Sequence, residues 1–475
     1  MEHILIVAYL AVLLTLALYG FHRSSLVYLY FKHKHNVPLA KGRFTDLPMV
    51  TVQLPLYNEP EVAERLIDAA CGLDWPRDRL EVQILDDSTD ATTARVAARA
   101  AAWRARGVDV VHVRRGDRRG FKAGALAHGL RRARGELVLV LDADFVPQAG
   151  LLRRALPHFG DPRVAVVQLR WAHLNRAAGL LTEAQALMLD GHFGVEQRAR
   201  HAAGLWFNFN GTAGLWRRAA IDDAGGWSAD TLTEDLDLSY RAQLCGWRFV
   251  YLDGESVPAE LPATMAAFLG QQHRWAKGSV QCARKLAVRA ARARAPWPVR
   301  LEALLHLSSN FAYPLSLLLA LLLGALALPP VAARVPGVFA WLAWAAPLGA
   351  AGTAAFVAYY LAAQRGVRGP VAALLRVPLV MAVGLGLSLN QTRAVLGGLC
   401  GATGEFVRTP KSGALGGQRA PRLRAGRWPW LEAVLAAYFA IACVAALDGG
   451  RWLVAPYLAL AAIGFAWVAA ALRLE

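Results

Sequence analysis

Long apolar stretches flank a polar central section, and this alternation predicts how the chain is organised. Residues 4–20 carry no charge, and further uncharged apolar runs return after residue 301. Each run approaches the roughly 20 residues that a helix needs to cross a bilayer. Because the first run lacks a small-residue cleavage site, we interpret residues 1–22 as a retained membrane helix and not as a signal peptide.

The later apolar runs predict four more membrane spans, two within 301–363 and two within 429–472. The stretch between them, 371–399, holds polar and charged side chains. If it crossed the membrane, the loop 404–428, with its six basic residues, would lie outside, against the positive-inside rule. We therefore predict an interfacial or re-entrant helix at 371–399, five spans in total, an external N-terminus and a cytoplasmic C-terminus.

The central section, residues 45–262, predicts an α/β domain with a mostly parallel sheet. Short β-rich runs alternate there with helical patterns, which is typical of βαβ units. The expected strands are 49–57, 81–86, 108–114, 136–142 and 164–170. The expected helices are 59–71, 91–106, 122–134 and 180–200.

Three segments complete this outline of the chain. Residues 206–218 are expected to form a loop packed by aromatic side chains. Thr231 and Glu234 have the spacing of a capping box, which predicts a helix over 234–245 that ends at Gly246. Apolar and basic residues interleave within 263–300, as expected of helices that lie along the cytoplasmic face of a membrane.

Composition narrows the class of protein. The hydrophobic share of 56% exceeds what is usual in a soluble enzyme. The net charge of +17 would suit a nucleic-acid partner, but Arg and Lys cluster beside the apolar runs, so we expect a lipid bilayer and no nucleic acid. The five cysteines lie far apart, which argues against a zinc site or a disulfide framework and favours a reducing cytoplasm for the polar domain.

The clearest chemical signal is an apolar run that ends in two carboxylates. Residues 137–141 are all Leu or Val, and Asp142 and Asp144 follow them. Such a run reads as a strand buried on both faces, and ligands bind at the carboxyl ends of such strands. The two carboxylates would project to one side and suit a divalent ion that keeps positions open for phosphates. An ordinary turn after a strand is the alternative for so short a pattern.

Other polar residues are expected at the same edge of the sheet. Tyr57 and Glu59 follow the first strand, and Asp86 and Asp87 end the second, where they would hold a base or ribose hydroxyls. Turn and capping chemistry is the alternative for these acidic residues. Lys122 opens a glycine-flanked helix whose N-terminus suits a phosphate, although a solvated lysine fits the pattern equally.

Two later clusters add candidate groups. Glu234 fits the capping box, whereas Asp235 is not needed for it and suits a base that takes a proton from an acceptor hydroxyl. Gln271, Arg274 and Trp275 combine amide and guanidinium donors with a flat ring, as expected at a sugar phosphate. Interfacial anchoring is the alternative for these three residues.

These motifs, taken in order, resemble a known family. Asp87, Asp142-x-Asp144, Thr233-Glu234-Asp235 and Gln271-x-x-Arg274-Trp275 resemble the D, DxD, TED and QxxRW series of membrane-bound family 2 glycosyltransferases. Residues 54–59, 70–76, 85–90, 209–214 and 271–275 are similar to plant cellulose-synthase-like β-mannan synthases and their bacterial relatives. The resemblance covers residues 45–285 and, more loosely, the membrane part. It implies a glycosyltransferase-A-type α/β domain joined to a transmembrane helical bundle.

The resemblance also implies roles for individual residues. Asp144, with Asp142, would hold Mg²⁺ or Mn²⁺ on the donor's diphosphate, and Asp235 would be the general base of an inverting transfer. The donor-binding residues would be Tyr57, Glu59, Asp86, Asp87, Lys122, Asp142 and Arg274. The acceptor-binding residues would be Asn210, Gly211, Thr212, Glu234, Gln271 and Trp275.

The basic loop 404–428 carries a partial match to a second family feature. Phe406, Thr409 and Lys411 resemble the FxVTxK gating loop of cellulose synthases, with Arg408 in place of the valine. The resemblance implies that this loop covers the bound donor. A connector without fixed structure is the alternative for a segment so rich in Gly and Arg.

The expected function is that of a β-glycan synthase in a bacterial-type inner membrane. Its donor would be GDP-mannose or UDP-glucose, and its acceptor the growing polysaccharide, which passes out through the membrane. A non-processive enzyme that glycosylates a membrane lipid is the first alternative. A transporter is the second, although the predicted spans lack paired charges and the acidic motifs lie outside them.

Overall fold

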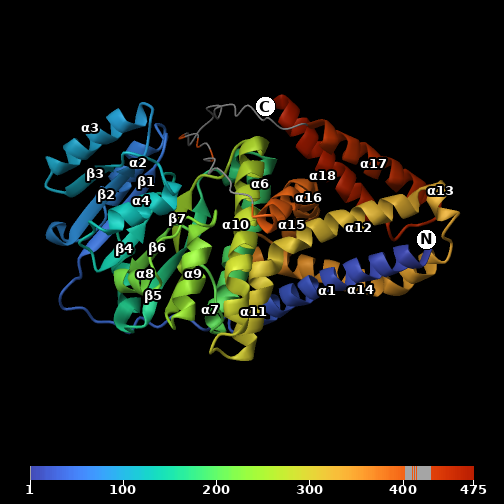
Figure 1. Cartoon of the computed structure of the whole chain (residues 1–475), viewed down its shortest axis with the longest axis horizontal. Helices are drawn as coiled ribbons and strands as arrows, with labels where there is room; N and C mark the ends of the chain where they lie inside the picture. Colours follow the sequence, from blue (N-terminus) through green and yellow to red (C-terminus); the bar gives the residue numbers. More distant parts are fainter. Residues whose placement is uncertain (1, 402–408, 410, 412, 414–428) are drawn as a thin grey trace.

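The computed structural model of the chain describes residues 2–401, 409, 411, 413 and 429–475. Figure 1 shows two parts, a sheet domain at one end and a bundle of long helices at the other. The sheet domain is built from the polar central section of the sequence. The helical bundle is built from the apolar segments that precede and follow it.

Seven strands of the described chain form one sheet, in the order β3-β2-β1-β4-β6-β5-β7. They are β1 (Val50–Leu56), β2 (Leu80–Asp86), β3 (Asp109–Arg114), β4 (Leu137–Val140), β5 (Val164–His173), β6 (Gly214–Arg217) and β7 (Arg248–Ala259). β6 runs antiparallel to its neighbours β4 and β5, and the remaining pairs are parallel. The predicted mostly parallel sheet is confirmed.

Helices cover both faces of this sheet, which explains why β4 is apolar throughout, although β1 and β2 also hold buried polar residues such as Gln53 and Gln83. In β4, Leu137 and Leu139 enter the hydrophobic core on one face, while Val138 and Val140 enter the core on the other. The first core is shared with α2 (Ala63–Cys71), α3 (Thr92–Arg104) and α5 (Leu151–Ala155). The second is shared with α4 (Phe121–Leu130), α8 (Arg218–Asp223) and α9 (Glu234–Leu244).

Two local predictions in this domain are wrong. The expected loop 206–218 contains strand β6 and the start of α8, because Gly214–Arg217 pairs between β4 and β5. The capping box is absent among the described contacts, since Thr233 and not Thr231 precedes α9, and Thr231 Oγ1 bonds instead to the Thr233 carbonyl at 3.3 Å. The helix itself ends as predicted, just before Gly246, whose φ of +93° suits glycine.

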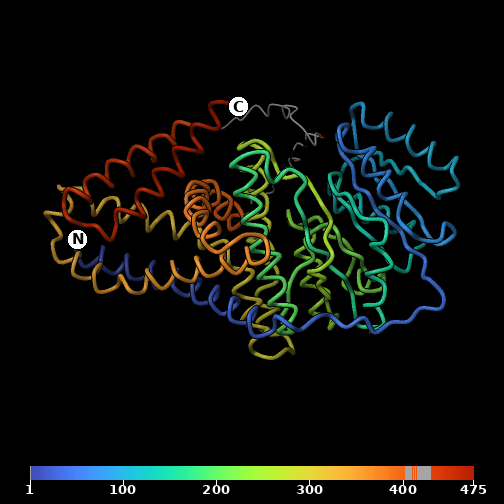
Figure 2. Tube along the Cα trace, turned by 180° about the vertical axis from the view of Figure 1, so that it is seen from behind, coloured from blue at the N-terminus to red at the C-terminus, as the bar shows by residue number. Residues whose placement is uncertain are grey.

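Five long helices extend side by side away from the sheet domain (Figures 1 and 2). They are α1 (Glu2–Lys32), α12 (Ala312–Ala327), α14 (Val338–Ala363), α17 (Pro429–Asp448) and α18 (Ala455–Leu474). α1 begins at the far end of the bundle, whereas α18 ends near the sheet domain, where a Glu475 side-chain oxygen accepts a bond from the Ala266 amide at 2.9 Å. The two chain ends therefore lie at opposite ends of the bundle.

Three other helices lie across this direction. Figure 1 shows α10 (Met265–Ala291) and α11 (Trp297–Ser308) between the sheet and the bundle, and α16 (Val377–Leu399) almost end-on. The short helices α6 (Leu180–Gly191), α7 (Arg198–Ala202), α13 (Pro329–Ala332) and α15 (Pro370–Leu374) complete the described helices. α16 therefore runs in a different direction from the five long helices.

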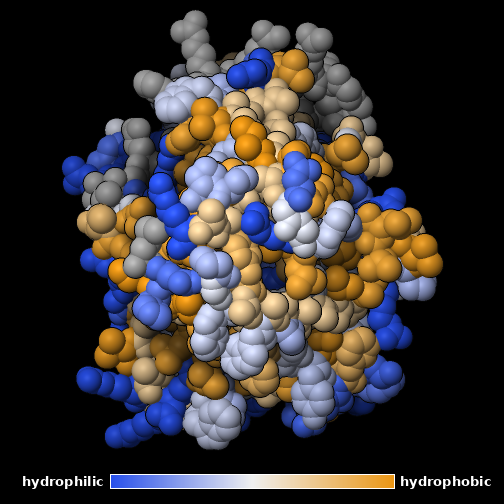
Figure 3. Space-filling model, turned by 90° about the vertical axis from the view of Figure 1, so that its right-hand side faces the viewer, coloured by the Kyte–Doolittle hydropathy of each residue, from blue (hydrophilic) through white to orange (hydrophobic). Residues whose placement is uncertain are grey.

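Six segments of the described chain are helical, long and apolar enough to cross a membrane, and one of them is 370–399. Seen from the bundle end, many orange hydrophobic side chains lie on the near surface, and most blue hydrophilic ones lie around its edge (Figure 3). By length and composition alone, the segment 370–399 could be a sixth membrane span. The interfacial assignment of this segment stays a prediction.

Candidate active site

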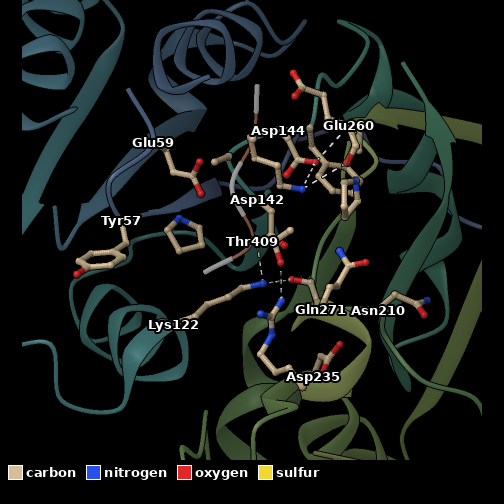
Figure 4. Close-up of a pocket in the computed structure, with 18 of the residues that line it drawn as sticks. Tyr57, Glu59, Lys122, Asp142, Asp144, Asn210, Asp235, Glu260, Gln271 and Thr409 are labelled. Atoms are coloured by element: carbon tan, nitrogen blue, oxygen red, sulfur yellow. Dashed lines mark hydrogen bonds and ion pairs between the residues drawn. The ribbon is translucent and has the colours of Figure 1, made fainter. Parts of the chain in front are cut away.

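A pocket opens where the carboxyl ends of β1, β2 and β4 face the start of α9 and the middle of α10 (Figure 4). Most of the residues singled out from the sequence line it: Tyr57, Glu59, Asp87, Lys122, Asp142, Asp144, Asn210, Gly211, Glu234, Asp235, Gln271, Arg274, Trp275, Thr409 and Lys411. Asp86 and Thr212 are not among the lining residues, and Phe406 lies outside the described part of the chain. Segments far apart in the sequence, from Tyr57 to Lys411, thus meet in one site.

The two carboxylates after β4 each face a lysine. Lys122 Nζ lies 2.6 Å from Asp142 Oδ1, and Lys411 Nζ lies 2.7 Å from Asp144 Oδ2. Asp144 is almost completely buried and also accepts a hydrogen bond from the Glu260 amide at 3.1 Å, whereas the Asp142 side chain is 35% exposed. Asp144 is therefore rigidly held, and Asp142 is the carboxylate more open to a ligand.

The carboxylate oxygens that follow β4 are of the kind that bind a hard divalent cation. Asp142 and Asp144 offer carboxylate oxygens, and both face ammonium groups, which shows that the site attracts positive charge. No cluster of three or more Asp, Glu, His or Cys ligands occurs among the described residues. A cation held here would need oxygens from another source, and Mg²⁺ and Mn²⁺ commonly complete their coordination with substrate phosphates and water.

Lys122 ties the acidic groups together. Besides Asp142, its ammonium lies 3.5 Å from Glu234 Oε1 and donates to the Gly211 carbonyl at 2.9 Å. Burial opposes the charged form, but the negative charges of Asp142 and Glu234 raise the pKa of Lys122 above its ordinary value. This lysine is a permanent cation at the centre of the pocket.

Gly211 occupies a position that another residue would disturb. Its φ is +84°, a conformation that glycine adopts readily. A Cβ atom at this position would lie 3.1 Å from Asp235 Oδ2. Glycine therefore lets the loop pass closely over the Asp235 carboxylate.

Asp235 lies on the first turn of α9, next to Glu234. Its Oδ1 accepts a hydrogen bond from the Leu236 amide at 2.8 Å. Burial, and after it the charge of Glu234, raises the pKa of Asp235 from 3.8 to about 7, against the opposing charge of Lys122. A carboxylate that titrates near neutral pH is suited to general-base chemistry.

The residues after β2 are arranged differently from the prediction. Asp86 is buried, with His112 Nε2 2.9 Å from Oδ2 and the Ser88 amide donating to Oδ1 at 2.8 Å, so it supports the loop. Asp87 lines the pocket, but Arg115 binds both of its oxygens. Only Asp87 of the two therefore borders the space where a ligand would lie.

Comparison with known proteins agrees with this geometry. Residues 48–278 match the family model described as "Glycosyltransferase like family 2". This region is a family 2 glycosyltransferase domain. The resemblance to cellulose-synthase-like mannan synthases is likewise confirmed for it by the relatives that share this region.

Two plant proteins illustrate that relationship. Over 253 residues, 52% of this chain, it is 46% identical to glucomannan 4-beta-mannosyltransferase 2 of Arabidopsis thaliana. It is 47% identical over the same length to the probable glucomannan 4-beta-mannosyltransferase 7 of Oryza sativa subsp. japonica. The matched parts are 47% and 43% of those proteins, so the chain spans about half the length of the curated relatives it matches.

A solved structure supports the same fold. The mannosyltransferase PcManGT from Pyrobaculum calidifontis, in complex with GDP-Man and Mn²⁺, is 26% identical and has a TM-score of 0.52. The match covers 75% of this chain and 97% of that one. It extends beyond the glycosyltransferase domain alone.

Trp275 of α10 and Trp171 of β5 form an aromatic part of the pocket wall. The rings of Trp275 and Trp171 lie 6.4 Å apart, and both line the pocket. Flat apolar rings of this kind contact the faces of sugars, whereas Gln271 and Arg274 on the same helix offer polar groups. Arg274 Nη2 donates to Thr409 Oγ1 at 3.4 Å, so α10 also contacts the loop residue Thr409.

The sequence did not indicate several residues that line the pocket. Trp171 and His173 lie on β5, and burial lowers the pKa of His173 to about 4, which keeps the ring neutral. Glu260 follows β7 and binds Arg65 Nη2 at 2.6 Å. Their sequence surroundings carry no motif, because they enter the pocket only through the order of strands in the sheet.

Proposed function

We propose that the chain is a membrane-bound, inverting mannosyltransferase that elongates a β-linked mannan or glucomannan from GDP-mannose. The observation that carries this proposal is the pocket itself. It combines two carboxylates suited to a metal, two lysines beside them and a separate carboxylate, Asp235, with a pKa of about 7. The names of the plant relatives, which are glucomannan mannosyltransferases, and the GDP-Man complex of PcManGT support mannose as the sugar.

The donor would lie on the side of Asp142, Asp144 and Lys122. A Mg²⁺ or Mn²⁺ ion held by the two aspartates would neutralise charge on the nucleoside diphosphate as it departs. Lys122 and Lys411, which contact these carboxylates, are placed to bind phosphate oxygens once a donor enters. Asp87 and Tyr57 border the part of the pocket where the nucleoside would fit.

The acceptor would approach from the side of Asp235 and Trp275. Asp235 would take the proton from the attacking hydroxyl while that oxygen forms its bond to the anomeric carbon. The bond from that carbon to the diphosphate oxygen breaks on the opposite face, which inverts the configuration. Trp275 and Trp171 provide a surface for the acceptor sugar, and Asn210 provides an amide.

Secretion of the product is part of the proposal. The pocket lies next to α10, and α10 packs against the apolar helices α16 and α18. A polymer that grows at Trp275 would therefore have a short path into the bundle. We place the protein in a bacterial-type inner membrane, with the glycosyltransferase domain in the cytoplasm and product leaving on the other side.

The test is a donor panel with protein purified in detergent. GDP-mannose, GDP-glucose, UDP-glucose and UDP-N-acetylglucosamine are offered with Mg²⁺, with Mn²⁺ and with EDTA. We expect release of GDP and formation of polymer with GDP-mannose plus metal. Transfer from a UDP-sugar alone, or full activity in EDTA, would contradict the proposal.

A further inference from the structure

A π-helical turn, His192–Gln197, joins α6 to α7 beside the pocket. Such turns are rare and occur frequently at functional sites, because the extra residue redirects neighbouring side chains. This turn is packed between β7 of the glycosyltransferase domain and the long helices α1 and α14. It therefore links the catalytic domain to the bundle.

His192 on this turn binds Asn210, which lies on the loop 208–212 at the proposed acceptor side of the pocket. Its Nε2 lies 2.8 Å from Asn210 Oδ1, and its Nδ1 lies 3.4 Å from Glu196 Oε2. Since Oδ1 of an amide only accepts, Nε2 is the donor in the first bond. Asn208 Nδ2 donates to the same Asn210 oxygen at 3.2 Å.

These two bonds decide which end of the Asn210 amide is available. Its oxygen is occupied by His192 and Asn208, and its NH₂ group donates one bond to the Asn208 carbonyl at 3.4 Å, so the second N–H of that group is the part that can serve a ligand. Asn210 lines the pocket, whereas His192 does not. His192 would therefore act through Asn210 and not by direct contact.

A buried ionic network holds His192 in place. Glu196 accepts from Arg200 Nη1 at 3.1 Å and from the Tyr359 hydroxyl of α14 at 2.9 Å. Arg200, only 2% exposed, also binds Glu302 of α11 at 2.8 Å. Elements from the domain and from the bundle thus fix the position of the ring.

We propose that His192 is a positioning residue that orients the Asn210 amide to donate a hydrogen bond to the acceptor sugar. This inference rests on the proposed function, because it assigns Asn210 to the acceptor. It adds a specificity element that no motif in the sequence indicates. The donor-side residue Lys122 meets the same loop one residue further on, at the Gly211 backbone carbonyl, whereas His192 contacts the Asn210 side chain.

The test uses two variants, each of which keeps a hydrogen-bond donor at the position of only one of the two ring nitrogens of His192. In His192→Gln the side-chain NH₂ reaches the place of Nε2, so the bond to Asn210 is retained. In His192→Asn it reaches only the place of Nδ1, so that bond is lost while a polar group remains near Glu196. Both variants remove the ring, and therefore a merely structural role would affect them alike.

We expect the KM for short β-mannan oligosaccharides to rise about tenfold in His192→Asn and about twofold or less in His192→Gln. The KM for GDP-mannose and the unfolding temperature should stay close to the wild type in both. Because the effect passes through Asn210, the double variant His192→Asn with Asn210→Ala should match Asn210→Ala alone. Equal losses in the two His192 variants, or additive losses in the double variant, would overturn the inference.

Calorimetric binding of the same oligosaccharide to the GDP-loaded protein provides a readout that needs no transfer. If the wild type binds the oligosaccharide but does not transfer mannose, the proposed function fails, and the variant comparison still decides the role of His192. We expect weakened binding in His192→Asn and restored binding in His192→Gln. Failure of the wild type to bind the oligosaccharide would overturn the assignment of His192.

Discussion

Replacing Asp235 by Asn removes a proton acceptor without changing the size of the side chain. Under the proposed mechanism, the attacking hydroxyl then has no base, and transfer should fall by about 10²–10⁴-fold. Asp142, Asp144 and Lys122 keep their contacts, because none of them bonds directly to Asp235. Binding of GDP should therefore stay close to that of the wild type.

The same variant should gain stability. Burial and the charge of Glu234 raise the pKa of Asp235 from 3.8 to about 7. If this pKa difference between the folded and unfolded states were fully expressed, the Asp235 carboxylate would lower the free energy of unfolding by about 4 kcal/mol at neutral pH or above. Because the side chain keeps some contact with solvent in the pocket and titrates together with Glu234, we expect about half of it, about 2 kcal/mol.

The stability difference between the wild type and Asp235→Asn depends on pH. Since the folded-state pKa is higher than the unfolded one, the contribution of the protonated group is fully present below pH 3.8 and is lost as the pH rises through about 7. The wild type should therefore be less stable than Asp235→Asn at about pH 8, and the difference should shrink toward about pH 5.

Three measurements on both proteins test this reasoning: mannosyl transfer, GDP binding by calorimetry, and unfolding temperature in detergent at the two pH values. We expect lost transfer, retained binding and a pH-dependent gain in stability. Near-normal turnover in Asp235→Asn would remove this residue from the base role. A stability difference that is independent of pH would show that the pKa of Asp235 is not raised.

The remaining predictions concern other parts of the site and the topology. Asp144→Asn should abolish metal-dependent transfer and weaken Mn²⁺ binding in the presence of GDP, measured by calorimetry; unchanged Mn²⁺ affinity would exclude Asp144 as a ligand. Gly211→Ala should lower kcat about tenfold or more, since its φ is +84° and its Cβ would lie 3.1 Å from Asp235 Oδ2; normal turnover would show that the loop can yield. A reporter fused near Gly413 should read cytoplasmic, and an external signal would refute the five-span topology.

Buried parallel strands were the most predictable part of the fold. β4 is covered on both faces and is apolar without interruption, whereas polar residues such as Gln53 and Gln83 interrupt the apolar runs of β1 and β2. The sequence alone still indicates all three strands, because apolar residues predominate in each. β6 and β7 were not predicted. β6 has only the residues Gly214–Arg217, and in β7 the apolar run 249–252 is short and is followed by Asp253, Gly254 and Glu255, which interrupt the strand pattern. Their place in the sheet depends on the neighbouring strands.

The carboxylates of the site could be predicted from the sequence, but the residues that pair with them could not. Asp142, Asp144 and Asp235 stand in short motifs whose position after a strand or at a helix start is readable. Their partners are set by tertiary contacts: Lys411 reaches Asp144 from 267 residues away in sequence. Arg115 and His192 occupy no motif and acquire their roles only when the chain is folded.

The central claim is that this pocket makes a β-linked mannan, and product analysis tests it most directly. Radiolabelled GDP-mannose is incubated with the purified protein and Mn²⁺, and the product is divided between organic solvent and water and treated with an endo-β-1,4-mannanase. We predict label that resists organic extraction and is released by the mannanase. Label that passes into the organic phase, or polymer that the mannanase leaves intact, would contradict the account.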